Sequence, residues 1–596
     1  MILQALKEYY DRKAADPDSG IAPLGWEWKE IPYLIVLRND GSFVRVEDTQ
    51  ELIGKKKRAK TFLVPSLGES KGSGVKSNFP WENAEYIFGI PLKQDKNNNV
   101  PKRRQEFIKR LEEYASFDWA KAILCFLKNT NVNEIATTYK NEWSQILKGS
   151  YMLFSINGIP VSDIDSFKKA YHSPCHEQSN ICIITGLQDI TKQNEPPIKG
   201  SGFLKVSPTQ KIQSELHIVS FNLDAFCSFR KERGMNAPIG QMTSLAYTTA
   251  LNDLLSENSH QKILVGDATT VFWSSRKTEL EDEFADMFLE PEKDNPDKGV
   301  EAIERLLSSV KSGAFEHDNE DTRFYVLGLA PNSARIAVRF WHAGTVAEME
   351  KRFADWFENL RIIHGPKEKE HLSLGRLLIS IARPQKTHAN GEGGTPLGKS
   401  ENVPPNLAGA VMRSILEGTS YPATLLSSTL VRIKATRDIT YPQAKLIKAF
   451  LTHNLERKLT VSLDKNNTNV GYRLGRLFAV LERIQQTANP GINATIRDRF
   501  YASASSTPAA VFGNLMRLKN HHLAKLTKTA FFEGLIGEIL YRDKDNPGVR
   551  EFPTHLSLQD QGMFALGYYH QRQDFFAHTK EMNETEASHD AEQVTE

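Results

Sequence analysis

A stretch rich in glycine and proline constrains the fold more than any other feature of this sequence. Residues 383–405 (RPQKTHANGEGGTPLGKSENVPP) contain four glycines, four prolines and almost no large apolar side chain. Such a composition cannot supply a packed element and is typical of a long loop or an inter-domain linker. We therefore expect a linker or loop at 383–406, with folded regions before and after it.

The regions on the two sides of this stretch differ in hydrophobic periodicity. Before it, residues 31–46 and 324–341 each place two apolar runs around a short turn, which predicts β-hairpins, and residues 346–360 have the spacing of an amphipathic helix. After it, helical spacing recurs at 444–455, 470–484, 508–526 and 529–541. The sequence thus predicts an α+β multi-domain protein, with a mixed α/β region over 1–382 and an all-α helical bundle over 407–576. The acidic end of the chain, 577–596, is expected to be a disordered tail.

Charge is distributed unevenly along the chain. The formal net charge is +2, yet residues 431–530 hold 17 Lys or Arg against 5 Asp or Glu, an excess of 12 positive charges. Such a separation of charge favours one surface that binds a polyanion, although solvated helix faces are the alternative for any single residue. We expect a basic groove for single-stranded nucleic acid in the helical region. Its candidate residues are Arg473, Arg476, Arg483, Arg497 and Arg499.

A second basic segment lies near the start of the chain. Its cations are Lys55, Lys56, Lys57, Arg58 and Lys60, and a loop of small and polar residues follows at 68–78 (GESKGSGVKSN). Glycine lets the main chain approach a phosphate backbone, Lys71 and Lys76 supply charge, and the Ser and Asn side chains can contact phosphates or base edges. A solvated basic loop is the alternative interpretation.

One motif resembles a nucleotide-binding loop. Residues 393–400 (GTPLGKS with its preceding glycine) match the pattern G-x-x-x-x-G-K-[ST] in full. The chemistry of that loop needs a strand before it and a helix starting at the lysine, so that backbone N–H groups converge on phosphates. Here a long polar stretch precedes the motif, and Pro404 and Pro405 would break the following helix. A flexible linker is therefore the favoured interpretation, with a nucleotide- or metal-dependent nuclease as the alternative.

Possible metal ligands do not form a recognisable site. His172, Cys175, His176 and Cys182 lie close together but lack the paired short knuckles of structural zinc sites. His317 begins an isolated His-Asp dipeptide without further ligands at helical spacing. We therefore expect no metal, no cofactor and no catalytic residue.

The cysteine content and the lack of long apolar runs bear on localisation. The four cysteines are too few and too scattered for a disulfide framework, which favours a reducing compartment. No stretch approaches the roughly 18 apolar residues of a membrane span, and no signal-peptide core is evident at the start. These features predict a cytoplasmic protein without a membrane partner.

Several long blocks of the sequence resemble one known family. The blocks are CIITG at 182–186, HIVSFNLDAFCSF at 217–229, NAP at 236–238, YTTALNDLL from Tyr247 and GDATTVFW at 266–273, with further matches such as FPWENAEYIFGI from Phe79 and GYYHQRQDFF from Gly567. Their succession is similar to the large subunit of the type I-C CRISPR surveillance complex (Cascade), of the Csd type. The resemblance covers nearly the whole chain.

The resemblance implies a non-catalytic subunit of an RNA-guided complex. Such a subunit reads a short motif beside the target (the PAM), stabilises the displaced strand of the R-loop, and helps recruit a helicase-nuclease for antiviral defence. The implied partners are CRISPR RNA, target double-stranded DNA, the repeat-binding, backbone and small subunits, and the helicase-nuclease. The C-terminal part, from about residue 470, resembles the small subunit, which this subtype makes from an internal start in the same gene.

The resemblance also assigns roles to the N-terminal loop. The family loop runs R-x-S-G, then Asn, an aromatic residue and Trp; this chain has Lys71, Ser73, Gly74, Asn78, Phe79 and Trp81. Lysine in place of arginine removes the bidentate fork that reads guanine. We therefore assign Lys71 and Lys76 to phosphate or groove contacts and Ser73 and Asn78 to PAM reading, and expect Phe79 and Trp81 to anchor the loop in the core. An unrelated single-strand-binding scaffold remains an alternative.

Overall fold

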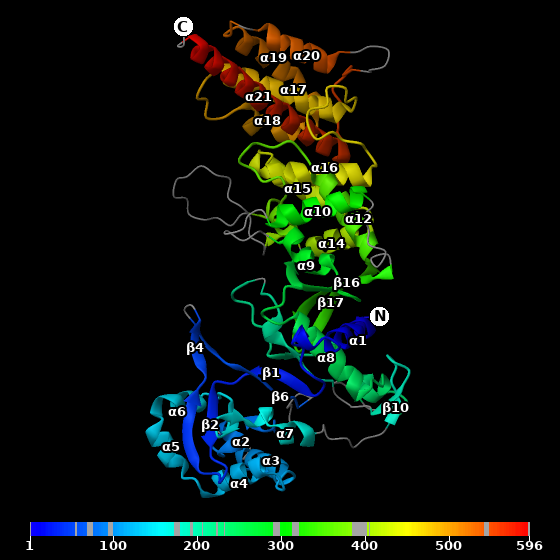
Figure 1. The fold of residues 1–596 in the computed structure, drawn as a ribbon. Helices are drawn as coiled ribbons and strands as arrows, with labels where there is room; N and C mark the ends of the chain where they lie inside the picture. Colours follow the sequence, from blue (N-terminus) through cyan, green and yellow to red (C-terminus); the bar gives the residue numbers. More distant parts are fainter. Residues whose placement is uncertain are drawn as a thin grey trace. The chain divides into compact units, whose positions relative to one another are not determined.

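The chain folds into two compact units (Figure 1). Unit 1 comprises Met1–Phe203, Lys211–Ser259 and Pro331–Ala337, and unit 2 comprises Leu204–Gln210, His260–Ala330 and Val338–Glu596. The computed structural model describes residues 2–53, 56–67, 75–92, 99–171, 179–190, 195–205, 207–221, 224–231, 233–289, 298–312, 321–383, 402–404, 406–527, 529–541 and 548–593.

A five-stranded sheet forms the centre of unit 1. Its strand order is β3 (Phe43–Asp48), β2 (Tyr33–Leu37), β8 (Met152–Ile156) and β7 (Trp81–Glu82), and β9 (Ile159–Pro160) pairs with β8. Strands β2 and β3 form the antiparallel hairpin predicted at 31–46, whereas β2 and β8 run parallel. Every residue of β2 and β8 is buried, as expected for central strands covered on both faces.

Two helices of unit 1 supply much of the core against this sheet. Helix α3 (Val100–Glu112) contributes Phe107 and Leu111, and α4 (Asp118–Asn129) contributes Ile123 and Phe126, all within one cluster with β2 and β8. Elsewhere in unit 1, α1 (Ile2–Ala14) packs against α8 (Gln241–Leu254).

The remaining elements of unit 1 are short. The strands are β1 (Trp26–Glu30), β4 (Gln50–Ile53), β5 (Lys56–Ala59), β6 (Thr61–Pro65), β10 (Ser179–Ile181), β11 (Gln188–Ile190), β12 (Ile198–Lys199) and β13 (Glu215–Leu216). The helices are η1 (Pro17–Ser19), α2 (Ala84–Ile87), α5 (Val132–Thr138), α6 (Lys140–Ile146), η2 (Val161–Asp163), α7 (Asp165–Ala170), η3 (Gly200–Gly202), η4 (Asp224–Phe226) and η5 (Arg233–Asn236).

A hairpin that begins and ends in unit 2 supplies the last piece of unit 1. Its strands are β16 (Arg323–Asn332) and β17 (Arg335–Thr345), which confirms the hairpin predicted at 324–341. The tip of the hairpin pairs with His217, whose N–H donates to the Ala334 carbonyl at 3.1 Å and whose carbonyl accepts from the Ile336 N–H at 2.9 Å. The same tip places Arg335 over the Phe226 ring, 5.2 Å from its centroid.

Unit 2 combines a four-stranded sheet with helices. The sheet order is β14 (Lys262–Val265), β15 (Ala268–Ser274), β16 and β17. The amphipathic helix predicted at 346–360 is confirmed as α12 (Val346–Leu360), which begins at a capping box formed by Thr345 and Glu348. Helices α9 (Glu279–Phe288), α10 (Lys298–Ser312) and α13 (Leu374–Ile379) complete this part.

From residue 407 onward, every described element is a helix, and this confirms the predicted change from a mixed α/β region to an all-α region. The helices are α14 (Leu407–Glu417), α15 (Ala423–Thr436), α16 (Tyr441–Asn454), α17 (Val470–Ala488), α18 (Ile496–Ala504), η7 (Pro508–Ala510), α19 (Phe512–Leu523), α20 (Ala530–Leu540) and α21 (Leu558–Gln593). Helices α17 and α21 make the most extensive helix pair of unit 2.

The glycine- and proline-rich stretch connects two helices of the same unit. Leu377 of α13 and Val411 of α14, on its two sides, are both buried in the core of unit 2. The stretch therefore does not coincide with a boundary between the two compact units. Residues 384–401 and 405 of the stretch lie outside the described residues.

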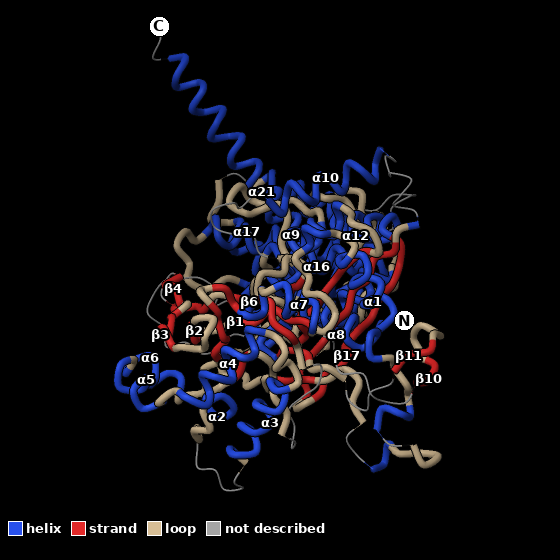
Figure 2. The backbone as a smooth tube through the Cα atoms, turned by 60° about the horizontal axis from the view of Figure 1, so that its bottom comes forward, coloured by secondary structure: helices blue, strands red, loops and turns tan. Residues whose placement is uncertain are grey.

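Helix α21 continues through most of the acidic segment that we expected to be disordered (Figure 2). Residues 577–593 extend a helix that is already formed, so they add turns without the cost of nucleation. Among the described residues, no helix combines the length and apolar character needed to cross a membrane.

Candidate nucleic-acid interface

The N-terminal loop predicted at 68–78 lies between strands β6 and β7, and a hydrogen bond joins these two strands. The indole N–H of Trp81, on β7, donates to the carbonyl of Pro65, the last residue of β6, at 3.0 Å. Trp81 is 2% exposed and Phe79 is 1% exposed, which confirms both as core anchors. The hydrogen bond therefore holds the end of β6 close to the start of β7.

An aromatic and cationic cluster surrounds Trp81. Tyr151 packs edge-on against it, with ring centroids 5.0 Å apart, and the Lys29 ammonium lies 4.7 Å from the Tyr151 centroid and 5.3 Å from that of Trp81. Burial raises the pKa of Tyr151 to about 12, so its phenol stays neutral near pH 7. These contacts enclose the Trp81 side chain.

A buried carboxylate and an arginine shape the segment just before β7. Glu82 is fully buried and accepts the backbone N–H groups of Asn78 at 3.0 Å and Asn83 at 2.9 Å. From α3, Arg110 donates to the Ser77 carbonyl, and its guanidinium lies 5.7 Å from the centroid of the Phe79 ring. These contacts hold residues 77–79 against the core.

This arrangement corrects one sequence-based assignment. Asn78 is only 6% exposed, and Ser77 is 1% exposed, so Asn78 does not present its amide for reading bases. Polar composition favoured contacts of the Ser and Asn side chains with DNA, but Ser77 and Asn78 are buried at the anchor. Lys76 is half-buried, and Lys71, Ser73 and Gly74 lie outside the described residues.

The basic run before this loop includes β5, which pairs antiparallel with β4 (Figure 1). Lys57 and Lys60 are exposed, whereas Arg58 makes a bidentate pair with Glu257 at 2.7 and 2.5 Å. Lys57 of β5 and Lys60, just after it, are therefore accessible to an anion, while the charge of Arg58 is already offset. Lys55 and the side chain of Lys56 lie outside the described residues.

The predicted basic face of α17 is contradicted by the structure. Arg473 is 1% exposed; its Nε donates to the Asn467 carbonyl at 2.8 Å, and its Nη1 donates to the carbonyls of Ile539 and Tyr541 at 3.1 and 3.3 Å. Its guanidinium therefore satisfies carbonyls at the C-terminal end of α20, where the helix dipole favours a cation.

Arg476 is also 1% exposed, and its guanidinium likewise connects α17 to neighbouring helices. It donates to Gln571 Oε1 at 3.1 Å and to Glu538 Oε1 at 2.7 Å, so it connects α17 to α21 and α20. Helix α17 is buried almost all round, and no basic face is left for solvent on its first three turns. The sequence analysis did not use Gly471 and Gly475, which approach the backbone of α21 and are the feature that indicates this close packing.

The other cations predicted in the helical region differ in their environment. Arg497 pairs with Asp438 at 2.8 Å and lies 3.7 Å from Glu482, while Arg483 is half-buried. Arg499, on α18, is exposed. The structure adds exposed Arg517 on α19, which the charge count included but did not distinguish. The exposed arginines Arg499 and Arg517 therefore lie on α18 and α19, whereas Arg473 and Arg476 of α17 are buried.

The described residues offer no metal site. No group of three or more His, Cys, Asp or Glu side chains among them is arranged to hold an ion. Cys182 is buried, with its Sγ 3.7 Å from Thr243 Oγ1. His172, Cys175, His176, His317 and the motif at 393–400 lie outside the described residues.

Comparison with known proteins decides the family. The sequence model of the CRISPR-associated protein family Cas_Csd1 matches residues 6–576. The chain belongs to the Csd1 family. The match begins inside α1 and ends inside α21, so the Csd1 region includes both compact units and confirms the resemblance carried by the sequence blocks. Comparison with curated proteins gives no match.

Proposed function

We propose that this Csd1-family protein is the non-catalytic large subunit of a type I-C Cascade, which reads the PAM and stabilises the R-loop. The observation that carries the proposal is the family match over nearly the whole chain. Base pairing by a guide reads the target sequence in such complexes, so the protein needs surfaces for a short motif and for phosphates rather than a catalytic site. The buried anchor at residues 77–82 and the exposed cations Lys57, Lys60, Arg499 and Arg517 support this role.

The proposed partners follow from the same role. They are CRISPR RNA, target double-stranded DNA, the repeat-binding, backbone and small subunits, and a helicase-nuclease recruited after R-loop formation. On the protein we assign PAM-side contacts to Lys71, Ser73, Gly74 and Lys76, backbone contacts to Lys57 and Lys60, and contacts with the displaced strand to Arg499 and Arg517. The exposure of Lys57, Lys60, Arg499 and Arg517 supports the last two groups.

The decisive experiment compares targets that differ only in the flanking motif. The complex is assembled with guide RNA, and its affinity is measured for a target with a functional PAM and for one with a scrambled flank. We expect discrimination by the wild-type complex, and we expect Lys71→Ala to reduce affinity mainly for the functional target. Lys121→Ala is the control, because Lys121 is an exposed lysine of the same unit that pairs with Asp118 at 2.9 Å.

Two outcomes would overturn the proposal. Equal affinity of the wild-type complex for both targets would exclude a role in PAM reading and favour a sequence-independent scaffold. ATP turnover or metal-dependent cleavage by the isolated chain, lost in Lys399→Ala, would favour the nuclease alternative. We expect neither activity.

A further inference from the structure

A strained turn in unit 1 displays an aromatic side chain. Ser228 and Lys231 form an antiparallel bridge, in which the Lys231 N–H donates to the Ser228 carbonyl at 2.8 Å. Between them, Phe229 and Arg230 have φ values of 51° and 60°. Two-residue turns with this left-handed backbone usually contain Asn-Gly or Gly-Gly, because a side chain at positive φ is strained.

One amide side chain braces both sides of the turn. Asn236 Oδ1 accepts from the Ser228 N–H at 3.2 Å and from the Ser228 hydroxyl at 2.7 Å. Asn236 Nδ2 donates to the Lys231 carbonyl at 2.9 Å. These three hydrogen bonds hold the backbone in a conformation that Phe229 and Arg230 do not favour by themselves.

The braced turn presents Phe229 to solvent. The side chain is 96% exposed, the highest value among the exposed large hydrophobic residues that the structure describes. A phenyl ring so exposed adds nothing to the core, and a glycine at the same position would remove the strain. The stability of the folded chain therefore does not account for this residue.

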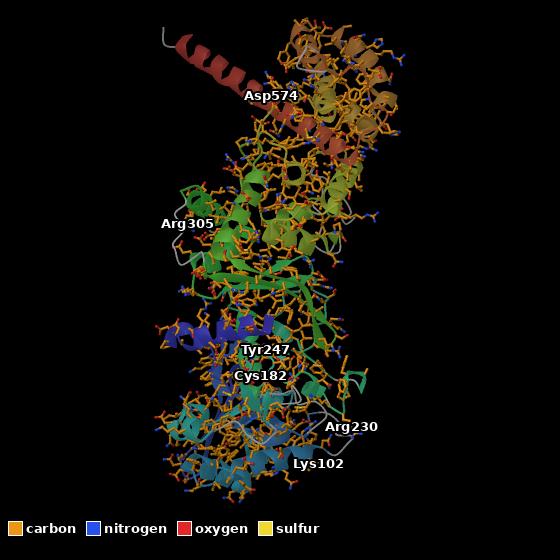
Figure 3. All side chains as sticks on the ribbon, turned by 90° about the vertical axis from the view of Figure 1, so that its right-hand side faces the viewer. Lys102, Cys182, Arg230, Tyr247, Arg305 and Asp574 are labelled. Atoms are coloured by element: carbon orange, nitrogen blue, oxygen red, sulfur yellow. The ribbon has the colours of Figure 1, made fainter. Side chains whose placement is uncertain are left out.

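The chemistry around the ring indicates what that ligand is. Arg230 and Lys231 are both exposed (Figure 3 labels Arg230). The turn 228–231 contains no acidic residue, and Glu232, which follows it, lies outside the described residues. An aromatic ring with two adjacent cations matches an unpaired nucleobase and its flanking phosphates, since base–aromatic stacking is tolerant of sequence and the cations pair with the backbone. An apolar pocket on a protein would accept the ring but would not use the cations.

We propose that Phe229 stacks on an unpaired base of the target DNA, with Arg230 and Lys231 contacting the adjacent phosphates. This inference rests on the proposed DNA-binding function and names one point of contact within it. Stacking of one base on an aromatic side chain accounts for about 5- to 150-fold in affinity.

The test uses a variant that is expected to fold at least as well as the wild type. Phe229→Gly removes the ring and relieves the positive φ, so its melting temperature should be equal or higher. In the complex assembled with guide RNA, 2-aminopurine is placed singly at positions beside the PAM and along the displaced strand. We expect wild type to quench its fluorescence at one or two positions, Phe229→Gly to lose that quenching and about 5- to 150-fold in affinity, and Phe229→Trp to retain both.

Two further variants distinguish stacking from other effects. Leu187→Ala removes another apolar side chain of unit 1 that is 68% exposed and should change nothing. Asn236→Ala keeps the ring but loosens the turn, so it should reduce quenching in the same positions as Phe229→Gly.

The outcomes separate this inference from the proposed function. A wild-type complex that fails to discriminate the PAM would contradict the proposed function itself. A complex that discriminates the PAM equally well with wild type and Phe229→Gly, with identical 2-aminopurine signals, would overturn only the stacking role. Failure of a well-folded Phe229→Gly chain to join the complex would overturn it in favour of a protein partner.

Discussion

At the residue scale, the same amino acid has opposite roles at different positions of the helical region. Arg473 and Arg476 are buried among backbone carbonyls and polar side chains, whereas Arg499 is exposed. Counting charges along the sequence detects the excess of positive charge but cannot separate these two kinds of arginine. Burial decides which of them is available to a nucleic acid.

Substitution of Arg473 and of Arg499 should therefore have complementary effects. Arg473→Ala leaves the carbonyls of Ile539 and Tyr541 without their donor, so we expect the free energy of unfolding to fall by on the order of 1–3 kcal/mol. Arg499→Ala should leave stability within about 0.5 kcal/mol of wild type. It should instead lower the salt slope of single-strand binding by about 0.7, the value for one lost phosphate contact.

Denaturant unfolding and salt titrations of binding measure these two quantities. If Arg499→Ala leaves both affinity and salt slope unchanged, α18 does not contact the displaced strand. If Arg473→Ala leaves stability unchanged, the carbonyl contacts do not hold α17 and α20 together.

His570 makes the packing of α17 and α21 sensitive to acid. It is 1% exposed, with its Nδ1 2.9 Å from the Tyr472 hydroxyl, and burial, reinforced by the charge of Lys448, lowers its pKa from 6.5 to about 3. The unfolded chain therefore binds a proton between pH 6.5 and about 3 that the folded chain does not, and stability falls as the pH decreases through this range. We expect His570→Gln to be less stable than wild type at pH 7.5, with a difference that narrows towards pH 5.

Thermal melts of both proteins from pH 7.5 to pH 5 check this expectation. A difference in melting temperature that stays constant over the whole range would show that His570 does not carry the acid sensitivity.

At the element scale, the sequence was informative where hydrophobic periodicity alone determines the structure. The hairpins at 31–46 and 324–341 and helix α12 are found as predicted because each buries one recognisable set of apolar residues. Helix α17 was correctly predicted as a helix. The prediction that it has an exposed basic face was wrong, because its arginines Arg473 and Arg476 are enclosed by α20 and α21. Several hydrogen-bond partners of these buried arginines come from segments that are distant in the sequence. Hydrophobic periodicity within one helix does not reveal such partners.

Close approach of the backbones of α17 and α21 depends on glycine. A Cβ at Gly475 would lie 2.0 Å from the Phe564 carbonyl oxygen and 2.8 Å from the Tyr568 nitrogen, so the two helices would have to separate. We expect Gly475→Ala to lower the free energy of unfolding by about 1–3 kcal/mol, although alanine favours helices.

Gly534 provides the matched control for this substitution. It lies inside α20 with open space where a Cβ would be placed, so Gly534→Ala should stabilise the protein by about 0.5–1 kcal/mol. Equal effects of the two substitutions in denaturant unfolding would contradict the role of Gly475 in helix packing.

At the scale of the whole molecule, the change in composition along the sequence does not coincide with the boundary between the two compact units. The glycine- and proline-rich stretch separates the mixed region from the helical region, yet α13 and α14 on its two sides share the core of unit 2. Composition reports where glycine and proline disfavour regular helices and strands. Compactness depends on contacts between distant segments, which a single sequence does not display.

The architecture of unit 2 bears on the proposed small subunit. Val470 is the first residue of α17, so a start there gives 127 residues that retain helices α17 to α21, whereas a start at Met516 would cut through α19. Such a product loses Leu426 of α15 and Leu451 of α16, which pack beside Gly562 of α21. We therefore expect a second product that begins near Val470. The face of its α21 that α15 and α16 cover in the full-length chain would be covered by another subunit of the complex.

N-terminal sequencing of every band that copurifies with the complex expressed from its native operon identifies such a product. Recovery of full-length chain alone, in a complex that binds target fully, would contradict the internal start.

The hairpin tip Pro331–Ala337 has a consequence for the order in which the protein is made. Unit 1 is not complete when residue 259 leaves the ribosome, because the backbone of His217 still lacks its partners Ala334 and Ile336. Roughly another eighty residues must be synthesised before that edge is closed, at about 5–20 residues per second. During those seconds the nascent chain exposes unpaired backbone groups, and a fragment ending at residue 259 would keep them exposed permanently.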